Sequence, residues 1–232
     1  MTETLDWLSQ SAHWTGWNGI PTRVIEHVWY SGVAVLLAVV IALPLGLLTG
    51  HTGRGSVPAT ALSNFGRALP TLGVVVLVFR LQPLSIWPVL AALVVIALPP
   101  ILLNTDVGIR SVAADVREAA SGMGMTGWQA LWGVEVPLAA PLILAGVRAA
   151  AGQVIATATI AAYVGLGGLG RYIIDGFAVR DIGQITGGAV IVGALALVVE
   201  GGFALAQRAM GGGPSSRQHV FGAFQQRKER RA

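Results

Sequence analysis

The chain has 232 residues, of which 54% are hydrophobic and only 11% charged, and its mean hydropathy is +0.69. A soluble domain needs roughly a quarter of its residues charged to cover its surface. This composition therefore excludes an ordinary water-soluble protein and predicts an all-α integral membrane protein. The formal net charge of +4 comes from basic residues that flank apolar segments, as membrane topology requires, so no nucleic-acid partner is expected.

Five apolar runs are long enough to cross a bilayer as helices, which takes about 20 residues when the chain is not tilted. They cover residues 28–48, 69–79 with residue 62 as an alternative start, 86–103, 138–164 and 185–207. Only helices satisfy their own backbone hydrogen bonds within a single spanning segment. Residues 25–208 are therefore predicted to form one membrane domain of five transmembrane helices.

The basic residues predict the orientation of these helices, because arginine and lysine are enriched in loops on the cytoplasmic side. They gather between spans one and two, between spans three and four, and after span five: Arg54, Arg67, Arg110, Arg117, Arg208, Arg217, Arg227, Lys228, Arg230 and Arg231. The opposite loops carry fewer: Arg23, Arg80, Arg171 and Arg180. The N-terminus is thus predicted outside and the C-terminus in the cytoplasm, as five spans require.

Residues 1–24 are predicted to form an extracytoplasmic or interfacial arm. Its first residues are acidic where a signal peptide needs basic ones, and Trp7, Trp14 and Trp17 interrupt any apolar core, so no cleavable signal is expected. We expect these tryptophans at headgroup depth along the outer face of the bilayer, in a short amphipathic helix or an irregular arm. Residues 209–232 are predicted to form a basic cytoplasmic tail near anionic membrane lipid.

The sequence gives no support for nucleotide or metal chemistry. A phosphate-binding P-loop needs a lysine after its last glycine, and the only lysine is Lys228. The glycines Gly165, Gly167, Gly168 and Gly170 match G-x-G-x-x-G, but they follow a membrane span without a β-α-β pattern. They predict a bent or re-entrant segment at the outer side. With no cysteine, and four histidines that lack His-Glu-x-x-His spacing, no metal site is predicted.

Two ionisable residues lie inside the predicted spans, where each costs at least a few kcal/mol. Arg148 falls about 16 Å along the fourth span from Pro137, and Glu200 about 12 Å along the fifth from Arg208. The two side chains are therefore predicted to meet at similar depth in the cytoplasmic half. A structural ion pair, snorkelling to the interface and a direct role in transport all fit this placement.

The loop of residues 106–137, between spans three and four, is the largest predicted cytoplasmic loop. Thr126 and Gln129 have the spacing of a capping box, which predicts that a short helix starts there. Gly122 and Gly124 permit the turn before it.

This short helix carries Trp128, Leu131 and Trp132, and Pro137 is expected to limit its length. The three side chains present more apolar surface than a lone turn could bury. They predict contact with a partner protein or with the rest of the loop.

Seven residues of the loop form a spaced motif: Glu118, Ala119, Ala120, Gly124, Val134, Val136 and Pro137. The motif resembles the E-A-A-x-x-x-G-x(9)-I-x-L-P loop of binding-protein-dependent ABC importer permeases, with valine at the Ile and Leu positions. In that family the loop is a coupling helix that docks into a groove of the ATPase subunit. The resemblance implies that Glu118 orients this helix, by hydrogen bonds or an ion pair with Arg110 or Arg117, and that Gly124 supplies the turn.

Other segments indicate which group within the family the chain resembles. Residues 64–71, 122–129, 134–148 and 158–170 are similar to permeases of the glycine betaine/carnitine/choline osmoprotectant group, and the similarity covers about residues 25–205. Methionine-importer permeases share the loop and the glycine-rich segment, and a permease for another small solute such as methionine is the nearest alternative.

The resemblance implies a type I ABC importer permease fold, like that of methionine importers, in the bacterial cytoplasmic (inner) membrane. A second permease subunit, identical or paralogous, would complete the path, and ATPase subunits would hold ATP and Mg²⁺. An extracytoplasmic binding protein would deliver substrate to the outer loops, and its aromatic cage would select a quaternary ammonium group. The chain itself is then a translocation subunit that binds no cofactor and catalyses no reaction.

Two further classes stay open at the level of sequence. A stand-alone secondary carrier or channel would transport without an ATPase, but the scarcity of midplane charge and the absence of inverted sequence halves speak against it. A non-transporting scaffold subunit would form a stable complex whose flux does not depend on the loop.

Overall fold

Four long apolar helices dominate the computed structural model, which describes residues 2–54, 73, 86–165 and 167–210. They are α2 (Ile20–Thr52), α5 (Trp87–Arg110), α8 (Val136–Ala158) and α10 (Ile182–Ala209). The shortest, α8, has 23 residues and so measures about 35 Å, which exceeds the roughly 30 Å of a hydrocarbon core. All four are long and apolar enough to cross a membrane.

Four of the predicted spans are found as helices, but several of their ends differ. α2 begins eight residues before residue 28, and α5 continues seven residues past residue 103, so the first five residues of the predicted 106–137 loop belong to α5. The first, third and fifth spans correspond to α2, α5 and α10, but α8 ends at Ala158, six residues before the predicted end, and a 3-10 turn, η3 (Thr159–Val164), follows. The hydroxyl of Thr159 donates to the carbonyl of Ala156 at 2.8 Å, a local bond that competes with the α-helical ladder. The predicted second span, apart from Gly73, and the tail beyond Met210 lie outside the described residues.

The main apolar core lies where α2, α5 and α8 pack along one another. Ala34, Ala38 and Ala42 recur every fourth residue on α2 and are buried against the other two helices. A Cβ added to Gly46 of α2 would lie 2.6 Å from Cβ of Thr105 on α5, so only glycine fits there. Small residues let membrane helices approach closely, and this close packing holds the three helices together.

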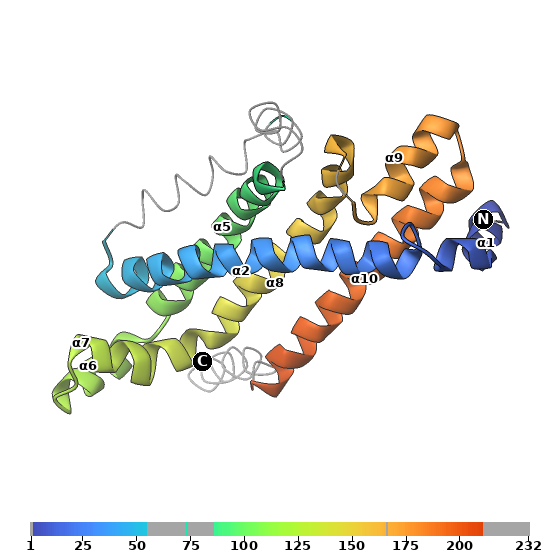
Figure 1. Ribbon diagram of the computed structural model, residues 1–232. Coiled ribbons are helices and arrows are strands. Elements are labelled where there is room, and N and C mark those ends of the chain that lie inside the picture. Colours follow the sequence, from blue (N-terminus) through green and yellow to red (C-terminus); the bar gives the residue numbers. More distant parts are fainter. Residues whose placement is uncertain (1, 55–72, 74–85, 166, 211–232) are drawn as a thin grey trace, which may run out of the picture.

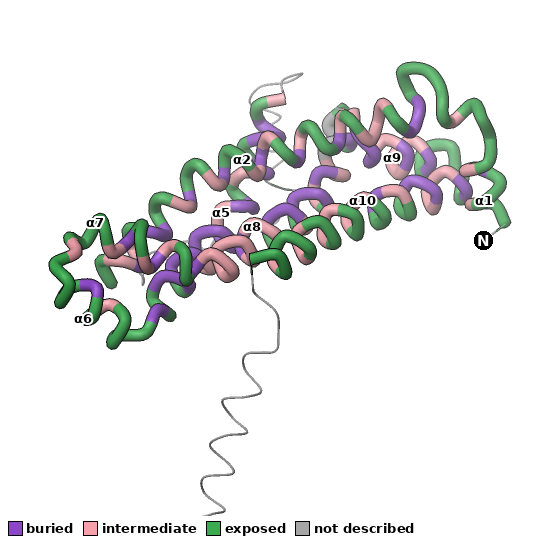
Figure 2. The backbone as a smooth tube through the Cα atoms, turned by 90° about the horizontal axis from the view of Figure 1, so that it is seen from below, coloured by how far each residue is buried: buried purple, intermediate pink, exposed green. Residues whose placement is uncertain are grey.

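Shorter elements cover the two ends of an elongated bundle (Figures 1 and 2). One end, which we call the loop end, carries α6 (Ala114–Gly122), α7 (Gly127–Ala130) and a single π-helical turn, η2 (Leu131–Glu135). The other end, the arm end, carries α1 (Thr2–Ser9), η1 (Ser11–Trp14) and α9 (Gly170–Val179). Figure 2 shows that much of the loop end is exposed.

The N-terminal arm packs on α10, and one of its three tryptophans is buried there. Trp7 is only 5% exposed, because its indole occupies a recess over Gly187, where an added Cβ would lie 2.5 Å from the ring. Trp14 and Trp17 are exposed. The arm is also shorter than predicted, since α2 already begins at Ile20.

Candidate functional site

The turn predicted within the 106–137 loop is formed by Gly124. This residue has a φ of +82°, in the left-handed region that favours glycine, and only Met123 separates it from the end of α6. The N–H groups of Gly124 and Met125 donate to the carbonyls of Ser121 and Ala120 at 2.9 and 3.2 Å. Gly122 is the last residue of α6 and is helical, so it makes no special contribution to the turn.

The capping box is confirmed. The N–H of Gln129 donates to Oγ1 of Thr126 at 3.4 Å, and the N–H of Thr126 donates to Oε1 of Gln129 at 2.8 Å. These reciprocal bonds satisfy two donors that a helix start otherwise leaves without partners. The position of Thr126 thus fixes where the chain turns helical again after Gly124.

The helix that starts there does not end at Pro137, contrary to expectation. It runs through α7 and the π-helical turn η2 into α8, so that Gly127–Ala158 form one long helix. Pro137 lies in the first turn of α8 and has no N–H to donate to the preceding turn. The wider π-helical turn just before it accommodates this interruption of the ladder. Val134 belongs to that turn, and Val136 is the first residue of α8.

A buried carboxylate that the sequence reading did not single out holds the loop in place. Glu135 is 3% exposed; its Oε2 lies 2.7 Å from Nδ1 of His51, on the last turn of α2. Its Oε1 lies 3.3 Å from Nε of Arg117 on α6. The signal available in the sequence was an isolated acidic residue in the apolar run before Pro137.

Glu118 is not a member of this cluster. It is exposed on α6, and its side chain makes no hydrogen bond or ion pair with any residue in the described part of the chain. Arg110 pairs with Asp106, and Arg117 pairs with Glu135 and donates to the carbonyl of Ile109. The expected contact of Glu118 with either arginine is therefore wrong, because both guanidinium groups have other partners. Ala119 is exposed beside it, whereas Ala120 is buried against the loop.

The three apolar residues predicted on the short helix divide into two groups. Leu131 is 2% exposed and packs with Leu47 and Ile109, so it holds the helix on the bundle. Trp128 and Trp132 are 66% and 48% exposed, and their rings meet edge to face at 5.6 Å. Exposed aromatic pairs of this kind are typical of protein–protein contact sites.

The predicted meeting of Arg148 and Glu200 is confirmed. Nε of Arg148 on α8 donates to Oε1 of Glu200 on α10 at 2.7 Å, and Nη1 donates to the side-chain carbonyl of Gln207 at 2.6 Å. A second guanidinium nitrogen, Nη2, also donates to the Glu200 carboxylate. The pair bridges two membrane helices, which offsets part of the cost of a charge in an apolar layer.

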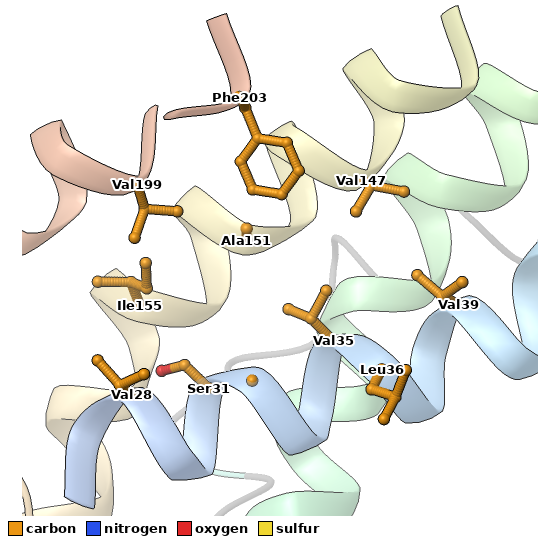
Figure 3. A pocket seen from close by; sticks show the side chains of 11 residues that line it. Val28, Ser31, Val35, Leu36, Val39, Val147, Ala151, Ile155, Val199 and Phe203 are labelled. Atoms are coloured by element: carbon orange, nitrogen blue, oxygen red, sulfur yellow. The ribbon is translucent and has the colours of Figure 1, made fainter. Parts of the chain in front are cut away.

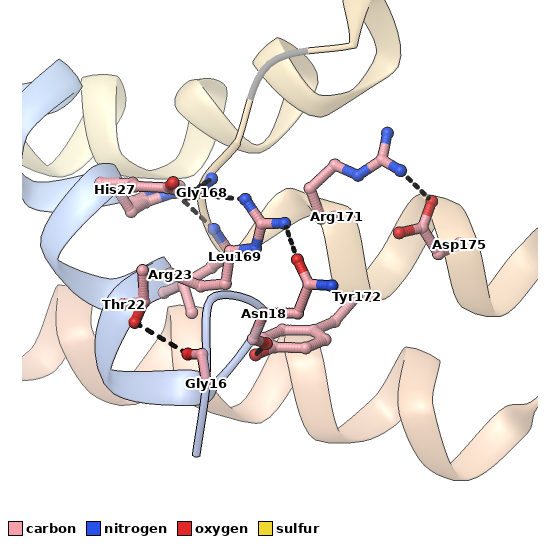
Figure 4. Close-up of polar contacts among 11 residues, drawn as sticks. Gly16, Asn18, Thr22, Arg23, His27, Gly168, Leu169, Arg171, Tyr172 and Asp175 are labelled. Carbon is pink, nitrogen blue, oxygen red and sulfur yellow. Dashed lines mark hydrogen bonds and ion pairs between the residues drawn. The ribbon is translucent and has the colours of Figure 1, made fainter. Parts of the chain in front are cut away.

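At the arm end the glycine-rich segment folds back onto the start of α2 (Figure 4). The N–H of Gly168 donates to the carboxylate of Glu26 at 2.7 Å, and the N–H of Leu169 donates to Nδ1 of His27 at 3.3 Å. The other ring nitrogen of His27 lies 2.9 Å from the carbonyl of Ile155 on α8. These backbone N–H groups are bound within the protein. In this chain the G-x-G-x-x-G pattern therefore shapes a turn of the backbone.

The glycines of this segment are needed for two different reasons, backbone conformation and close packing. Gly165 and Gly168 have φ of +85° and +88°, which other residues rarely adopt. Gly167 lies against Glu26 of α2, and Gly170 lies against the backbone of Thr159. The chain thereby turns back at the arm end, as the glycine pattern predicts.

The arm joins the same polar contacts. The hydroxyl of Tyr172 on α9 donates to the carbonyl of Asn18 at 2.5 Å, and Nη2 of Arg23 donates to the Asn18 side chain at 2.6 Å (Figure 4). Burial is the main cause that raises the pKa of the Tyr172 hydroxyl, with Arg23 opposing and Glu26 supporting the shift. The hydroxyl therefore stays protonated and continues to donate.

An apolar cavity of about 370 Å³ lies between α2, α8 and α10 (Figure 3). Among its described lining residues Phe203 is aromatic and Ser31 is polar, and none is charged. A cage for a quaternary ammonium group uses several aromatic faces. The described lining does not offer such a cage. In the described ranges no group of three or more histidine, aspartate and glutamate side chains gathers as metal ligands would.

Known proteins match most of this chain. The family model of the binding-protein-dependent transport system inner membrane component matches residues 34–205. The glycine betaine/carnitine/choline transport system permease protein OpuCB of Bacillus subtilis is 36% identical over 183 residues, which cover 79% of this chain and 84% of the relative. The osmoprotectant import permease protein OsmW of Salmonella typhimurium is 33% identical over 186 residues, 78% of this chain and 86% of the relative.

The fold matches as well. A chain of the methionine ABC transporter MetNI, in an inward-facing conformation, superposes with a TM-score of 0.73 at 20% identity, covering 82% of this chain and 95% of that chain. At that identity the likeness concerns the fold alone. The family and the four apolar helices place the chain in the bacterial inner membrane as a multi-pass protein. It belongs to the inner membrane components of binding-protein-dependent transport systems, as a relative of the permeases for glycine betaine, carnitine and choline.

Proposed function

We propose that the chain is the translocation subunit of an ATP-driven importer for osmoprotectants, small quaternary ammonium solutes such as glycine betaine, choline or carnitine. The names of its relatives support this substrate class, including a choline transport permease of Bacillus subtilis that is 37% identical over 186 residues. The alternative of methionine is suggested by the shared loop motif and glycine-rich segment. The methionine transporter resembles this chain in fold at 20% identity, a likeness that carries no substrate. The chain itself binds no cofactor in this proposal and catalyses no reaction.

The observation that carries the proposal is the exposed pair of Trp128 and Trp132 at the loop end. The capping box and the buried Leu131 hold this pair on a helix that continues into α8. A groove of an ATPase subunit would cover both rings. Closure of two ATPase subunits on ATP and Mg²⁺ would then push on the long helix directly.

In this proposal the loop end faces the cytoplasm and the arm end faces outward. The distribution of arginine and lysine supports this orientation, with Arg54, Arg110, Arg117 and Arg208 at or near the loop end. A fifth transmembrane helix would lie in the segment between α2 and α5. The N-terminus is then outside and the C-terminus in the cytoplasm.

A second permease subunit, identical or paralogous, would complete the path, and an extracytoplasmic binding protein would deliver the solute at the arm end. The apolar, uncharged lining of the cavity between α2, α8 and α10 supports the view that substrate selection takes place on the binding protein. The permease would provide alternating access.

The substrate class can be tested by uptake into cells that lack other osmoprotectant importers and express this chain with its native partner genes. Radiolabelled glycine betaine, choline, carnitine and methionine are offered in turn, and the first three are also offered with excess unlabelled methionine as competitor. We expect uptake of at least one quaternary ammonium solute that excess methionine does not reduce. Uptake of labelled methionine, with none of the three others, would contradict the proposal.

A further inference from the structure

The carboxylate of Glu135 is the point where the 106–137 loop is joined to the membrane helices. It lies at the end of the π-helical turn η2, immediately before α8, and its side chain is 4% exposed. One oxygen contacts His51 of α2 at 2.7 Å and the other contacts Arg117 of α6 at 3.3 Å. A single buried side chain thus joins three segments that are distant in sequence.

Arg117 extends this connection to a fourth segment. Its Nη2 donates to the carbonyl of Ile109, in the last turn of α5. This carbonyl also accepts from the N–H of Val112 just beyond the helix, and the guanidinium group adds a second bond at the end of α5. Through Glu135 and Arg117, the loop segment from α6 to η2 contacts the ends of both α2 and α5.

The surroundings of these groups are tightly packed. Leu47, Ile109, Leu131 and Ala139 form an apolar cluster at the same end of the bundle. A Cβ added to Gly127 would lie 3.2 Å from Nε2 of His51, so the start of α7 lies directly against this imidazole. Buried charged groups depend strongly on their partners, because a charge left alone in such a place is poorly solvated.

We propose that Glu135 is a positioning residue that makes the 106–137 loop move together with α2 and α5, so that motion of the loop is transmitted to these helices. This inference rests on the proposed function, in which the loop receives the motion of an ATPase. Trp128 and Trp132 offer the contact surface, and Glu135 fixes the helix that carries them. Without this connection, the loop would shift while the helices stayed behind.

The experiment uses the complete transporter, purified with its copurifying subunits and reconstituted into liposomes with its binding protein. Solute uptake and ATP hydrolysis are measured in the same sample. Glu135→Gln keeps the size of the side chain but removes the charge, and we expect uptake per ATP hydrolysed to fall by about threefold or more. Asp115→Asn is the matched control, because Asp115 is an exposed carboxylate of α6 whose side chain, among the residues that the structure describes, bonds only to the N–H of Val116.

A second pair of variants keeps the test decisive should Glu135→Gln fail to fold. His51 is partly exposed, so its replacement is milder. His51→Leu removes the donor to Glu135 and is expected to lower uptake per ATP. His51→Gln places an amide donor there and is expected to recover most of the coupling. Equal coupling in both variants would overturn the proposal.

A distance measurement tests the positioning role directly. The chain contains no cysteine, so Thr52→Cys on α2 and Ser121→Cys on α6 can carry two spin labels at exposed positions without background labelling. We expect a narrow distance distribution in the parent protein and in Asp115→Asn, and a broader one with Glu135→Gln or His51→Leu. An unchanged distribution in both of these variants would overturn the proposal.

Different results would contradict the proposed function and the positioning role of Glu135. Spin-label distances are measured on the permease itself and do not require an ATPase, so they decide the positioning role in every case. Absence of an ATPase from the purified parent protein would count against the proposed function. An importer with normal ATPase content, in which Glu135→Gln leaves uptake per ATP unchanged, would overturn the positioning role alone.

Discussion

Arg148 of α8 and Glu200 of α10 form an ion pair between two membrane helices, with Nε donating to Oε1 at 2.7 Å. Their side chains are 31% and 45% exposed in the single chain. Hydrocarbon solvates such groups poorly, so each charge depends on the other and on Gln207, which accepts a further bond from Arg148.

From this dependence we predict that Arg148→Met and Glu200→Leu each lower the melting temperature of the detergent-purified protein, since each leaves one charge without its partner. The double variant Arg148→Met/Glu200→Leu should recover much of the loss, because no charge then stays unpaired. Thermal unfolding monitored by tryptophan fluorescence provides the measurement. A double variant no more stable than the worse single variant would show that the pair has another role.

Gly124 and Gly122 provide a matched comparison in one turn. Gly124 has a φ of +82°, where an added Cβ costs about 1 kcal/mol, whereas Gly122 is helical with open space around it. Gly124→Ala should therefore lower stability and reduce the yield of copurified ATPase. Gly122→Ala should be neutral or slightly stabilising, because alanine favours the helix. The same result for both variants would contradict the assigned turn.

Substitutions of loop-end side chains should distinguish residues that contact the ATPase from residues that stabilise the fold. Trp128→Ala and Trp132→Ala remove exposed rings and should reduce copurified ATPase with little change in melting temperature. Leu131→Ala removes a side chain that is 2% exposed and should destabilise the protein by about 2–5 kcal/mol. Quantitative mass spectrometry of the purified complex gives the amount of ATPase, and a melting curve gives the stability. Full ATPase recovery with both tryptophans replaced would exclude them as the docking surface.

The N-terminal arm should detach when its anchor is removed. Trp7 stacks on His13 at 4.2 Å between ring centres and packs over Gly187 of α10. Trp7→Ala deletes most of this buried surface, at a cost of about 3–5 kcal/mol for the arm contact. We expect faster cleavage of the arm in limited proteolysis, whereas Trp17→Ala, at a 90% exposed position, should leave the rate unchanged. Equal cleavage rates in both variants would contradict the packing of Trp7.

Much of this fold could be predicted from hydrophobic segments and short-range patterns. Four of the predicted spans are found as helices, and the capping box of Thr126 and Gln129 lies where its spacing places it. The pairing of Arg148 with Glu200 was also predictable, because helix rise converts sequence position into depth along a helix. These features depend on local backbone geometry or on depth in the membrane.

Contacts between distant segments were not predictable in this way. Glu135 and His51 are 84 positions apart, and nothing in either local sequence indicates that the two side chains meet. Trp7 looked like an interfacial residue, and its burial depends on a recess at Gly187 in the last helix. Pro137 predicted a limit to the helix, but it lies in the first turn of α8, just after a π-helical turn, and the helix continues past it.

The most direct test of the account is to tag the wild-type chain and Gly124→Asp, purify both from the native membrane in mild detergent and identify the copurifying proteins by mass spectrometry. We expect the wild type to bring down an ABC ATPase and a permease partner, and Gly124→Asp to lose the ATPase while it stays folded in the membrane. If neither well-folded protein brings down an ATPase, the chain is not an importer permease coupled through the 106–137 loop.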